Sequence, residues 1–250
     1  SSKLPRFPFD KFADANNSLS TQMKATGEVM SIGRTFEESL LKGIRSLEIG
    51  AFHIHLRKFD TMSREELLAY IRIGTDDRIY AIAQLFRLGC DVDSIAGETA
   101  IDRFFLRKIR NIVAMEDEIS RHQNDVTTLW EAKKHGFSDK EIGLLWNKTE
   151  TDIYRFRQQS TVRPTYKMID TCASEFESYI PYFYSTYEEE NESRVSDKKK
   201  IVVLGSGPIR IGQGVEFDYS TVHAVQTIQK AGYEAIIINN NPETVSTDYT

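Results

Sequence analysis

The sequence predicts a mainly α-helical chain that leads into the first βαβ unit of an α/β domain. Helix-capping patterns recur between residues 51 and 187 with apolar positions at helical spacing behind them. From residue 201 onward, two short all-apolar runs flank a glycine-rich turn and an amphipathic helix pattern. The 250 residues are 40% hydrophobic and 28% charged, which is typical of one or two globular domains.

The first zone, residues 1–50, precedes the helices. Three phenylalanines at 7, 9 and 12 alternate with charge and proline, which predicts an extended, half-buried segment. Residues 26–34 read as a short strand closed by glycine. Thr35 with Glu38 three residues later has the capping-box pattern that opens a helix. The apolar positions that follow at helical spacing are Leu40, Leu41, Ile44 and Leu47.

The second zone, residues 51–187, is predicted to fold as an irregular bundle of short helices. Capping pairs open several of them, and Gly89 and His135-Gly136 end two more. A central helix over 101–119 carries a broad apolar face. Strand patterns return only after Pro164, at 166–169 and 182–184. The capping pairs are Ser63 with Glu66, Ser138 with Glu141 and Thr149 with Asp152, and the apolar face of 101–119 includes Phe104, Phe105, Ile109, Ile112, Val113 and Met115.

Residues 188–200 are polar, lack apolar anchors and are interpreted as a linker. The third zone, 201–250, begins with an apolar strand at 201–204, and a second buried strand follows at 235–238 after one helix. The right-handed crossover rule makes these two strands parallel neighbours. An apolar run of this kind is typical of a parallel sheet that is covered on both faces.

The turn between strand and helix is glycine-rich but matches neither common nucleotide motif. A dinucleotide fingerprint needs glycine where Arg210 stands, and a Walker A loop needs lysine where Gln213 stands. Glycines at a helix N-terminus still let an oxyanion approach backbone N–H groups. The glycines alone leave a phosphate-type site and a tight turn that binds nothing equally open.

Composition argues against several classes of protein. The net charge of −5 offers no basic footprint for nucleic acid, and no apolar run approaches the ~20 residues of a membrane span.

The cysteines and histidines do not have metal-site or disulfide spacing. Cys90 and Cys172 are far apart in the sequence, which favours reduced thiols. His53 and His55 are the only close histidine pair, and without a third ligand nearby in the sequence no metal site is predicted. Both ends of the chain read as the inside of a longer polypeptide.

Longer strings carry a resemblance to a known family. GSGPIRIGQGVEFDY at 205–219 and NPETVSTDY at 241–249 closely resemble the opening of the second synthetase half of carbamoyl phosphate synthetase large subunits. FPFDKF at 7–12 and QMKATGEVMSIGR at 22–34 resemble the end of the ATP-grasp domain of the first half. DTCASEF at 170–176 and YFYSTY at 182–187 resemble the end of the connecting oligomerization domain.

The resemblance implies a domain organisation. Residues 1–50 would end the first ATP-grasp domain and 51–187 would be the helical oligomerization domain. After the linker at 188–200, residues 201–250 would begin the carbamoyl phosphate synthetic domain, as the first βαβ unit of a Rossmann-like pre-ATP-grasp fold.

The resemblance also implies a function. The family makes carbamoyl phosphate from bicarbonate, glutamine-derived ammonia and two ATP, with Mg²⁺ (or Mn²⁺), for arginine or pyrimidine biosynthesis. The implied partners are a small glutaminase subunit and further copies of the large subunit, in the cytoplasm. The ATP and metal residues of the family lie outside these 250 positions, so no catalytic residue and no metal ligand is assigned here, and the chain alone is expected to be inactive.

Within the chain, the resemblance points to the route that carbamate takes between the two halves. Glutamates line the family's internal tunnel, and the matching positions are Glu28, Glu216 and Glu243, with Met23 nearby. From spacing alone, an ordinary surface carboxylate is the better interpretation of each glutamate. The resemblance favours the tunnel for Glu216 and Glu243 and leaves the two interpretations level for Glu28. The candidates for a substrate-facing loop are Gly205, Gly207, Arg210 and Gly214.

Two other functions remain open from the residues. Residues 137–157 have helix-turn-helix spacing, and Arg155, Arg157 and Arg163 would be its phosphate contacts. Two capped helices inside a bundle explain the same spacing, since Glu141, Glu150 and Asp152 lie on the same pair of helices. A stand-alone helical interaction module is the other alternative, with Trp130, Trp146, Tyr154 and Phe156 as candidate anchors, although a core position is the better interpretation of each aromatic.

Overall fold

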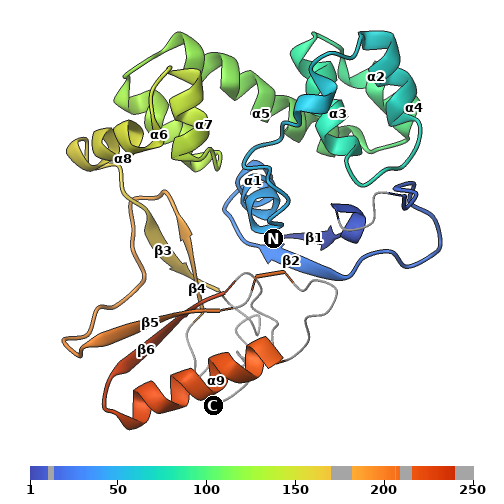
Figure 1. Cartoon of the computed structure of the whole chain (residues 1–250). Helices are drawn as coiled ribbons and strands as arrows, with labels where there is room; N and C mark the ends of the chain where they lie inside the picture. The colour runs from blue at the N-terminus through green and yellow to red at the C-terminus, as the bar shows by residue number, and fades with distance from the viewer. Residues whose placement is uncertain (11–13, 170–181, 206, 209–215, 240–250) are drawn as a thin grey trace.

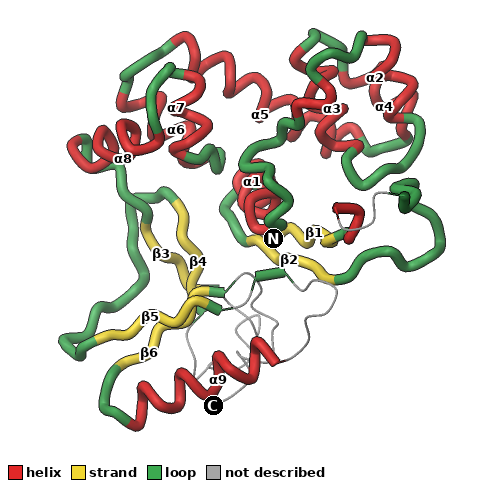
Figure 2. Tube along the Cα trace, viewed as in Figure 1, coloured by secondary structure: helices red, strands yellow, loops and turns green. Residues whose placement is uncertain are grey.

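A computed structural model describes residues 1–10, 14–169, 182–205, 207–208 and 216–239. Most of the helices form two groups in Figure 1: α2 (Arg64–Ile71) to α4 (Val92–Thr99) on one side and α6 (Val126–Lys134) to α8 (Glu150–Gln159) on the other, with the long helix α5 (Arg103–Arg121) running between them. The strands lie below these two groups as three separate pairs, which Figure 2 shows in yellow, and the last helix, α9 (Glu216–Lys230), lies below the strands. The mainly helical fold class predicted from the sequence is confirmed.

The chain begins with an antiparallel hairpin that packs beneath the first helix. Strands β1 (Ser2–Arg6) and β2 (Gly27–Ser31) pair with Ser2 opposite Ser31, so the predicted strand within 26–34 is confirmed. The predicted extended segment is wrong at Pro8–Asp10, which forms a 3₁₀ turn. Proline favours the first position of a helical turn because its φ is already fixed there.

Helix α1 (Phe36–Ser46) begins where its cap predicts. The Thr35 side chain accepts a hydrogen bond from the Glu38 backbone N–H. The reciprocal half of the capping box is absent, because the Glu38 carboxylate accepts instead from the Arg34 backbone N–H at 3.1 Å and from the Thr186 hydroxyl at 3.1 Å. The apolar positions of α1 are buried as expected and join the main core, namely Leu40, Leu41, Ile44 and Leu47.

The helical zone is built from short capped helices around one apolar core. The capping boxes at Ser63/Glu66 and Thr149/Asp152 are complete, so these two predictions are confirmed. Ser138 caps its helix in the same way, but the Glu141 side chain turns elsewhere. The elements are η2 (Arg57–Phe59), α2 (Arg64–Ile71), α3 (Arg78–Arg87), α4 (Val92–Thr99), α5 (Arg103–Arg121), α6 (Val126–Lys134), α7 (Asp139–Leu145) and α8 (Glu150–Gln159).

The apolar face predicted for the central helix is too wide at its start. Ile109, Ile112 and Val113 are buried, but Phe104 and Phe105 keep 52% and 45% of their surface exposed. The two phenylalanines lie in the first turn of α5, at the edge of the core. There their rings pack on each other and on Phe36, which shields only part of their surface.

The candidate interface aromatics divide between core and surface. Trp146 is 2% exposed, and its indole N–H donates to the Ile119 carbonyl at 2.7 Å. Phe156 and Trp130 are partly buried against the core, whereas Tyr154 is half exposed. Of the two cysteines, Cys90 is a buried free thiol, and Cys172 lies outside the described residues.

Two strand pairs lead out of the helical region. The two strands that the patterns after Pro164 predict are present as β3 (Thr165–Met168) and β4 (Phe183–Thr186), and the structure pairs them antiparallel. β5 (Lys200–Leu204), helix α9 (Glu216–Lys230) and β6 (Glu234–Ile238) then form a crossover whose two strands pair in parallel, Lys200 opposite Glu234. This is the predicted βαβ unit.

The expectation that both faces of this small sheet are covered is wrong for the described residues. Helix α9 packs on β5 and β6. The apolar side chains at the ends of the two strands nevertheless stay exposed, Leu204 by 77% and Ile238 by 57%. A single helix can cover only one face of a two-stranded sheet, so the other face stays exposed. Within the described ranges, none of the helices combines the length and hydropathy needed to cross a membrane.

Candidate functional site

The residues proposed for a tunnel lie at the surface where they are described. Met23 is 92% exposed in the loop before β2. Glu28 is an exposed residue of β2 whose carboxylate lies 2.8 Å from the Lys3 ammonium, and Glu216 is exposed at the first position of α9. Glu243 lies outside the described residues. A tunnel lined by these side chains therefore needs further chain to cover them, and their role stays a prediction.

Two of the four loop candidates are described, and both bring backbone close to other groups. The Gly205 N–H donates to the Ile238 carbonyl at 2.8 Å, and a Cβ on Gly205 would lie 3.1 Å from that oxygen. A Cβ on Gly207 would lie 2.8 Å from a carboxylate oxygen of Glu48, a residue at the end of the first zone. Arg210 and Gly214 lie outside the described residues. Close approach to the Ile238 carbonyl explains Gly205, whereas the neighbour of Gly207 is the end of a flexible side chain, which does not by itself require glycine.

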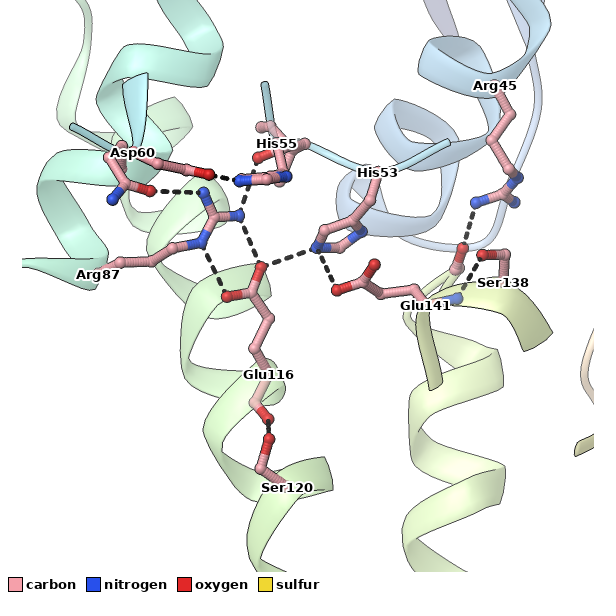
Figure 3. Close-up of polar contacts among 12 residues, drawn as sticks. Arg45, His53, His55, Asp60, Arg87, Glu116, Ser120, Ser138 and Glu141 are labelled. Carbon is pink, nitrogen blue, oxygen red and sulfur yellow. Dashed lines mark hydrogen bonds and ion pairs between the residues drawn. The ribbon is translucent and has the colours of Figure 1, made fainter. Parts of the chain in front are cut away.

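A buried polar cluster connects the two groups of helices (Figure 3). His53, 2% exposed, comes from the segment that follows α1. Its Nε2 lies 2.7 Å from the Glu116 carboxylate of α5 and 4.0 Å from the Glu141 carboxylate of α7. Arg87 of α3 donates to both oxygens of Glu116, at 2.9 and 2.7 Å. Four segments distant in the sequence meet at this point.

The tautomer of His53 follows from its surroundings. Its Nδ1 is buried and has no hydrogen-bond partner among the residues that the structure describes. Leaving a lone pair unpaired costs less than burying an unpaired N–H, so the proton belongs on Nε2, which donates to Glu116. Burial alone would raise the pKa of the Glu116 carboxyl, but the hydrogen bonds from Arg87 and His53 outweigh it and lower the pKa to about 2.

The cluster contains residue types that bind metals, but one of its carboxylates is already neutralised by an arginine. Ligand atoms of His53, Glu116 and Glu141 all lie within 4.8 Å of one another. Arg87, however, already neutralises Glu116 through both carboxylate oxygens. Mg²⁺ prefers several free oxygen ligands and water, so these residues do not fit the Mg²⁺ that the family resemblance implies.

The sequence analysis missed the partners of His53. It considered only the neighbouring His55, whose ring lies 2.7 Å from the exposed Asp60 carboxylate instead. Glu116 and Glu141 are supplied by other helices, and no local spacing connects them to His53. The one available indication was that Glu116 lies at helical spacing from Ile112 and Ile119, on the apolar face of α5.

A second buried ionic cluster holds α6, α7 and α8 together. Arg157 of α8 donates to both oxygens of Asp139 at 2.7–3.0 Å, and the Lys133 ammonium lies 3.1 Å from the same carboxylate. Burial lowers the pKa of Lys133 to about 8, against the attraction of Asp139. Because Arg157 is only 7% exposed, it does not supply the phosphate contact that a DNA-binding module would need.

Comparison with protein families decides between the remaining possibilities. Residues 28–161, more than half of the chain, match the oligomerisation domain of the carbamoyl-phosphate synthetase large chain. The chain belongs to the carbamoyl phosphate synthetase large-chain family. Residues 197–250 also match the carbamoyl phosphate synthase preATP-grasp domain, which places α1 to α8 in the first match and β5 to β6 in the second.

The two matches occur in the order expected for this synthetase family. The oligomerisation match begins within β2 and includes all of α1, whose buried residues belong to the same core as those of α2 to α7. By its packing, α1 therefore belongs to the helical region. The domain boundaries predicted at residues 50, 187 and 200 stay a prediction.

Proposed function

We propose that this chain forms part of the large subunit of a glutamine-dependent carbamoyl phosphate synthetase. The enzyme would make carbamoyl phosphate from bicarbonate, glutamine-derived ammonia and two ATP. The observation that carries the proposal is the parallel β5–α9–β6 crossover with its glycine turn, within the preATP-grasp match and downstream of the oligomerisation domain. The described residues contribute framework and connection, and ATP and Mg²⁺ would be bound by other parts of the enzyme.

The proposed roles of the chain are subunit association and passage of carbamate between the two catalytic halves. Association with further large subunits fits the name of the matched domain, and a small glutaminase subunit would supply ammonia. Carbamate is labile in water, so excluding water along its route would protect it. The chain by itself is expected not to hydrolyse ATP, and the cytoplasmic location remains a prediction from the family resemblance.

Glu28, Glu216 and Glu243, with Met23, are the proposed lining of that route. A test is the Glu216→Ala substitution in the complete enzyme. If Glu216 lines the route, each half keeps its own partial activity while coupled carbamoyl phosphate synthesis falls, by about tenfold or more, the loss that ~1.4 kcal/mol of coupling represents.

Asp218→Ala provides the matched control, because Asp218 also lies in the acidic first turn of α9. Loss of a stabilising charge at the helix N-terminus affects both variants alike. Equal coupling in wild type and Glu216→Ala, or equal losses in the two variants, would contradict the tunnel role of Glu216.

A further inference from the structure

The acidic segment after β4 does not leave the hairpin as a free chain. Residues 188–192 descend beside β3 on the side away from β4 (Figure 2). The Glu192 N–H donates to the Tyr166 carbonyl at 2.8 Å, and the Met168 N–H donates to the Glu192 carboxylate at 2.6 Å. The Tyr166 N–H donates to the Asn191 side chain at 2.8 Å. This segment, the acidic strap, thus occupies the edge of β3 that β4 leaves open.

The alternation of hydrogen bonds along β3 explains why this edge is available. In an antiparallel pair, every second residue of a strand exchanges backbone bonds with the same neighbour. Ile169, directly after β3, donates from its N–H to the Tyr182 carbonyl at 2.8 Å, next to β4. Tyr166 and Met168 are out of phase with Ile169, so their backbone groups face the opposite edge, where the strap lies.

A buried lysine of β3 holds the strap by charge. The Lys167 side chain is only 8% exposed. Its ammonium lies 3.7, 4.0 and 3.6 Å from the carboxylates of Glu188, Glu190 and Glu192. Alternate residues of an extended segment lie on one face, which explains how three glutamates at this spacing reach the same ammonium. Glu188 also pairs with Arg34 at 2.7 Å. A buried cation needs compensating charge, and the strap supplies it.

The other end of the connection is attached to the βαβ unit. The Ser196 hydroxyl donates to the Glu234 carboxylate of β6, and the Glu234 N–H donates to the Lys199 carbonyl at 3.0 Å. Between the strap and Ser196 the chain has only residues 193–195, and Val195 among them is 84% exposed. The connection therefore consists of two attached pieces with three residues between them.

The strap limits how far the βαβ unit can move from the hairpin. From Glu192 to Ser196 are four peptide steps, which reach about 14 Å when fully extended. Without the strap contacts the last attached residue would be Thr186 of β4, whose hydroxyl donates to the Glu38 carboxylate of α1 at 3.1 Å. The ten steps from Thr186 to Ser196 reach about 35 Å. Release of the strap would thus more than double the reach of the connection.

We propose that the acidic strap is a charge-dependent restraint on the βαβ unit, with Lys167 as the residue that holds it. While Lys167 is paired, residues 188–192 stay on β3 and keep the start of the preATP-grasp match close to the hairpin. Loss of that charge turns the same residues into a longer, flexible tether. The restraint goes beyond the proposed function, and its test does not depend on enzymatic activity.

The test is amide hydrogen exchange in the intact large chain with Lys167→Met, which keeps a long unbranched side chain and removes the charge. We expect exchange at Tyr166, Met168 and Glu192 to accelerate about tenfold, because these N–H groups donate to the strap or belong to it. Ile169 should exchange at the wild-type rate, because its N–H donates toward β4. Unchanged exchange at the three strap-bonded amides would overturn the proposal.

A second variant neutralises the strap itself, so that damage to the hairpin by Lys167→Met cannot decide the result. Glu188→Gln, Glu190→Gln and Glu192→Gln together leave β3 and β4 unaltered. Exchange at positions 166, 168 and 192 should again accelerate about tenfold, and adding Lys167→Met should accelerate it no further, because residues in contact are not additive. Additive effects, or equal acceleration at Ile169 in the variant without Lys167→Met, would overturn the proposal.

Lys198→Met is the matched control, because Lys198 is an exposed lysine of the same connection outside the strap. It should leave exchange at the strap unchanged. A protease that cleaves after glutamate gives an independent readout, since cleavage follows the population of the open form. Cleavage after Glu188, Glu190 and Glu192 should be about tenfold faster in Lys167→Met than in wild type or Lys198→Met. Equal cleavage of the three proteins would contradict the restraint.

Discussion

Glu116 illustrates how a carboxylate stays charged within the helical region. Its side chain is 12% exposed, yet Arg87 donates to both of its oxygens and His53 donates a third hydrogen bond. A buried carboxylate avoids ionisation unless such donors compensate for the lost water. Here the compensation is sufficient to lower the pKa to about 2, so Glu116 acts as a charged connection between α3, α5 and the segment after α1.

Replacing Glu116 by glutamine should therefore lower the free energy of unfolding. We expect a loss of about 3 kcal/mol at pH 7, because Arg87, whose side chain is only partly exposed, would lose its partner charge. Since the pKa is lower in the folded state, this stability is fully present above the unfolded-state pKa of about 4.5 and is lost as the pH falls toward about 2.

Urea unfolding at a series of pH values measures this effect. The wild type should lose stability between pH 4.5 and pH 2 more steeply than Glu116→Gln does. Glu118→Gln, two residues along the same helix and about half exposed, is the matched control and should change stability little. Parallel pH profiles for wild type and Glu116→Gln would contradict the assignment.

At the scale of the helices, some predicted capping boxes form completely and others form only in part. Ser63/Glu66 and Thr149/Asp152 form complete capping boxes at the surface. In α1 and α7 the serine or threonine still caps, but Glu38 and Glu141 contribute to tertiary contacts instead of closing the box. Where a carboxylate at the third helical position lies near other buried polar groups, those groups compete with the helix N-terminus for it.

Two glycines that end helices, Gly89 and Gly136, differ in how closely other atoms pack around them. Gly136 ends α6 with a φ of 88°, and a Cβ there would lie 2.8 Å from the backbone Cα of Glu38. Gly89 ends α3 with a φ of 80° and has open space around it. Both positions favour glycine by backbone conformation, but only Gly136 also packs against the backbone of another helix.

We expect Gly89→Ala to reduce the free energy of unfolding by about 1–2 kcal/mol, the cost of a left-handed backbone for a residue with Cβ. Gly136→Ala should cost about 1–3 kcal/mol more, because overpacking adds to the same backbone strain. Thermal unfolding of both variants measures the difference. Equal losses would show that the α6–α7 turn is not packed on α1 as the structure has it.

At the scale of the whole molecule, helix α1 belongs to three neighbourhoods. It packs on the β1–β2 hairpin, contributes to the core shared with α2 to α7, and contacts the β3–β4 hairpin through Glu38 and Lys42. Figure 1 shows α1 above the β1–β2 pair. The two ionic clusters, around Glu116 and Asp139, lie within the helical region. The helical region is thus joined through α1 to the β3–β4 hairpin, which precedes the preATP-grasp match in the chain.

Self-association is the prediction that belongs to this scale. If the matched oligomerisation domain acts as its name implies, light scattering should give a mass well above the 28.7 kDa of one chain, and the mass should fall on dilution. The mass should fall because the equilibrium follows protomer concentration. Tyr154→Ala, at a half-exposed aromatic, tests one candidate anchor, while Trp146 is unsuitable because it is core. A constant mass of one chain at all concentrations would contradict association through this region.

The sequence by itself determined most of the elements and their order: the capped helices, the two strands after Pro164 and the parallel β5–α9–β6 crossover. Caps, apolar periodicity and the crossover rule act over a few residues or one supersecondary unit, so they can be read locally. It also indicated the family through long strings that the comparisons confirmed.

Only the tertiary structure decided which polar groups meet. His53 joins Glu116 and Glu141, Arg157 turns inward to Asp139, and Glu48 faces Gly207, although no local spacing relates the members of these sets. Tertiary structure also left Phe104 and Phe105 half exposed, since the width of a buried stripe depends on the neighbouring helices. The physical reason is that burial and ion pairing are properties of surfaces in contact, and the chain brings those surfaces together only when it folds.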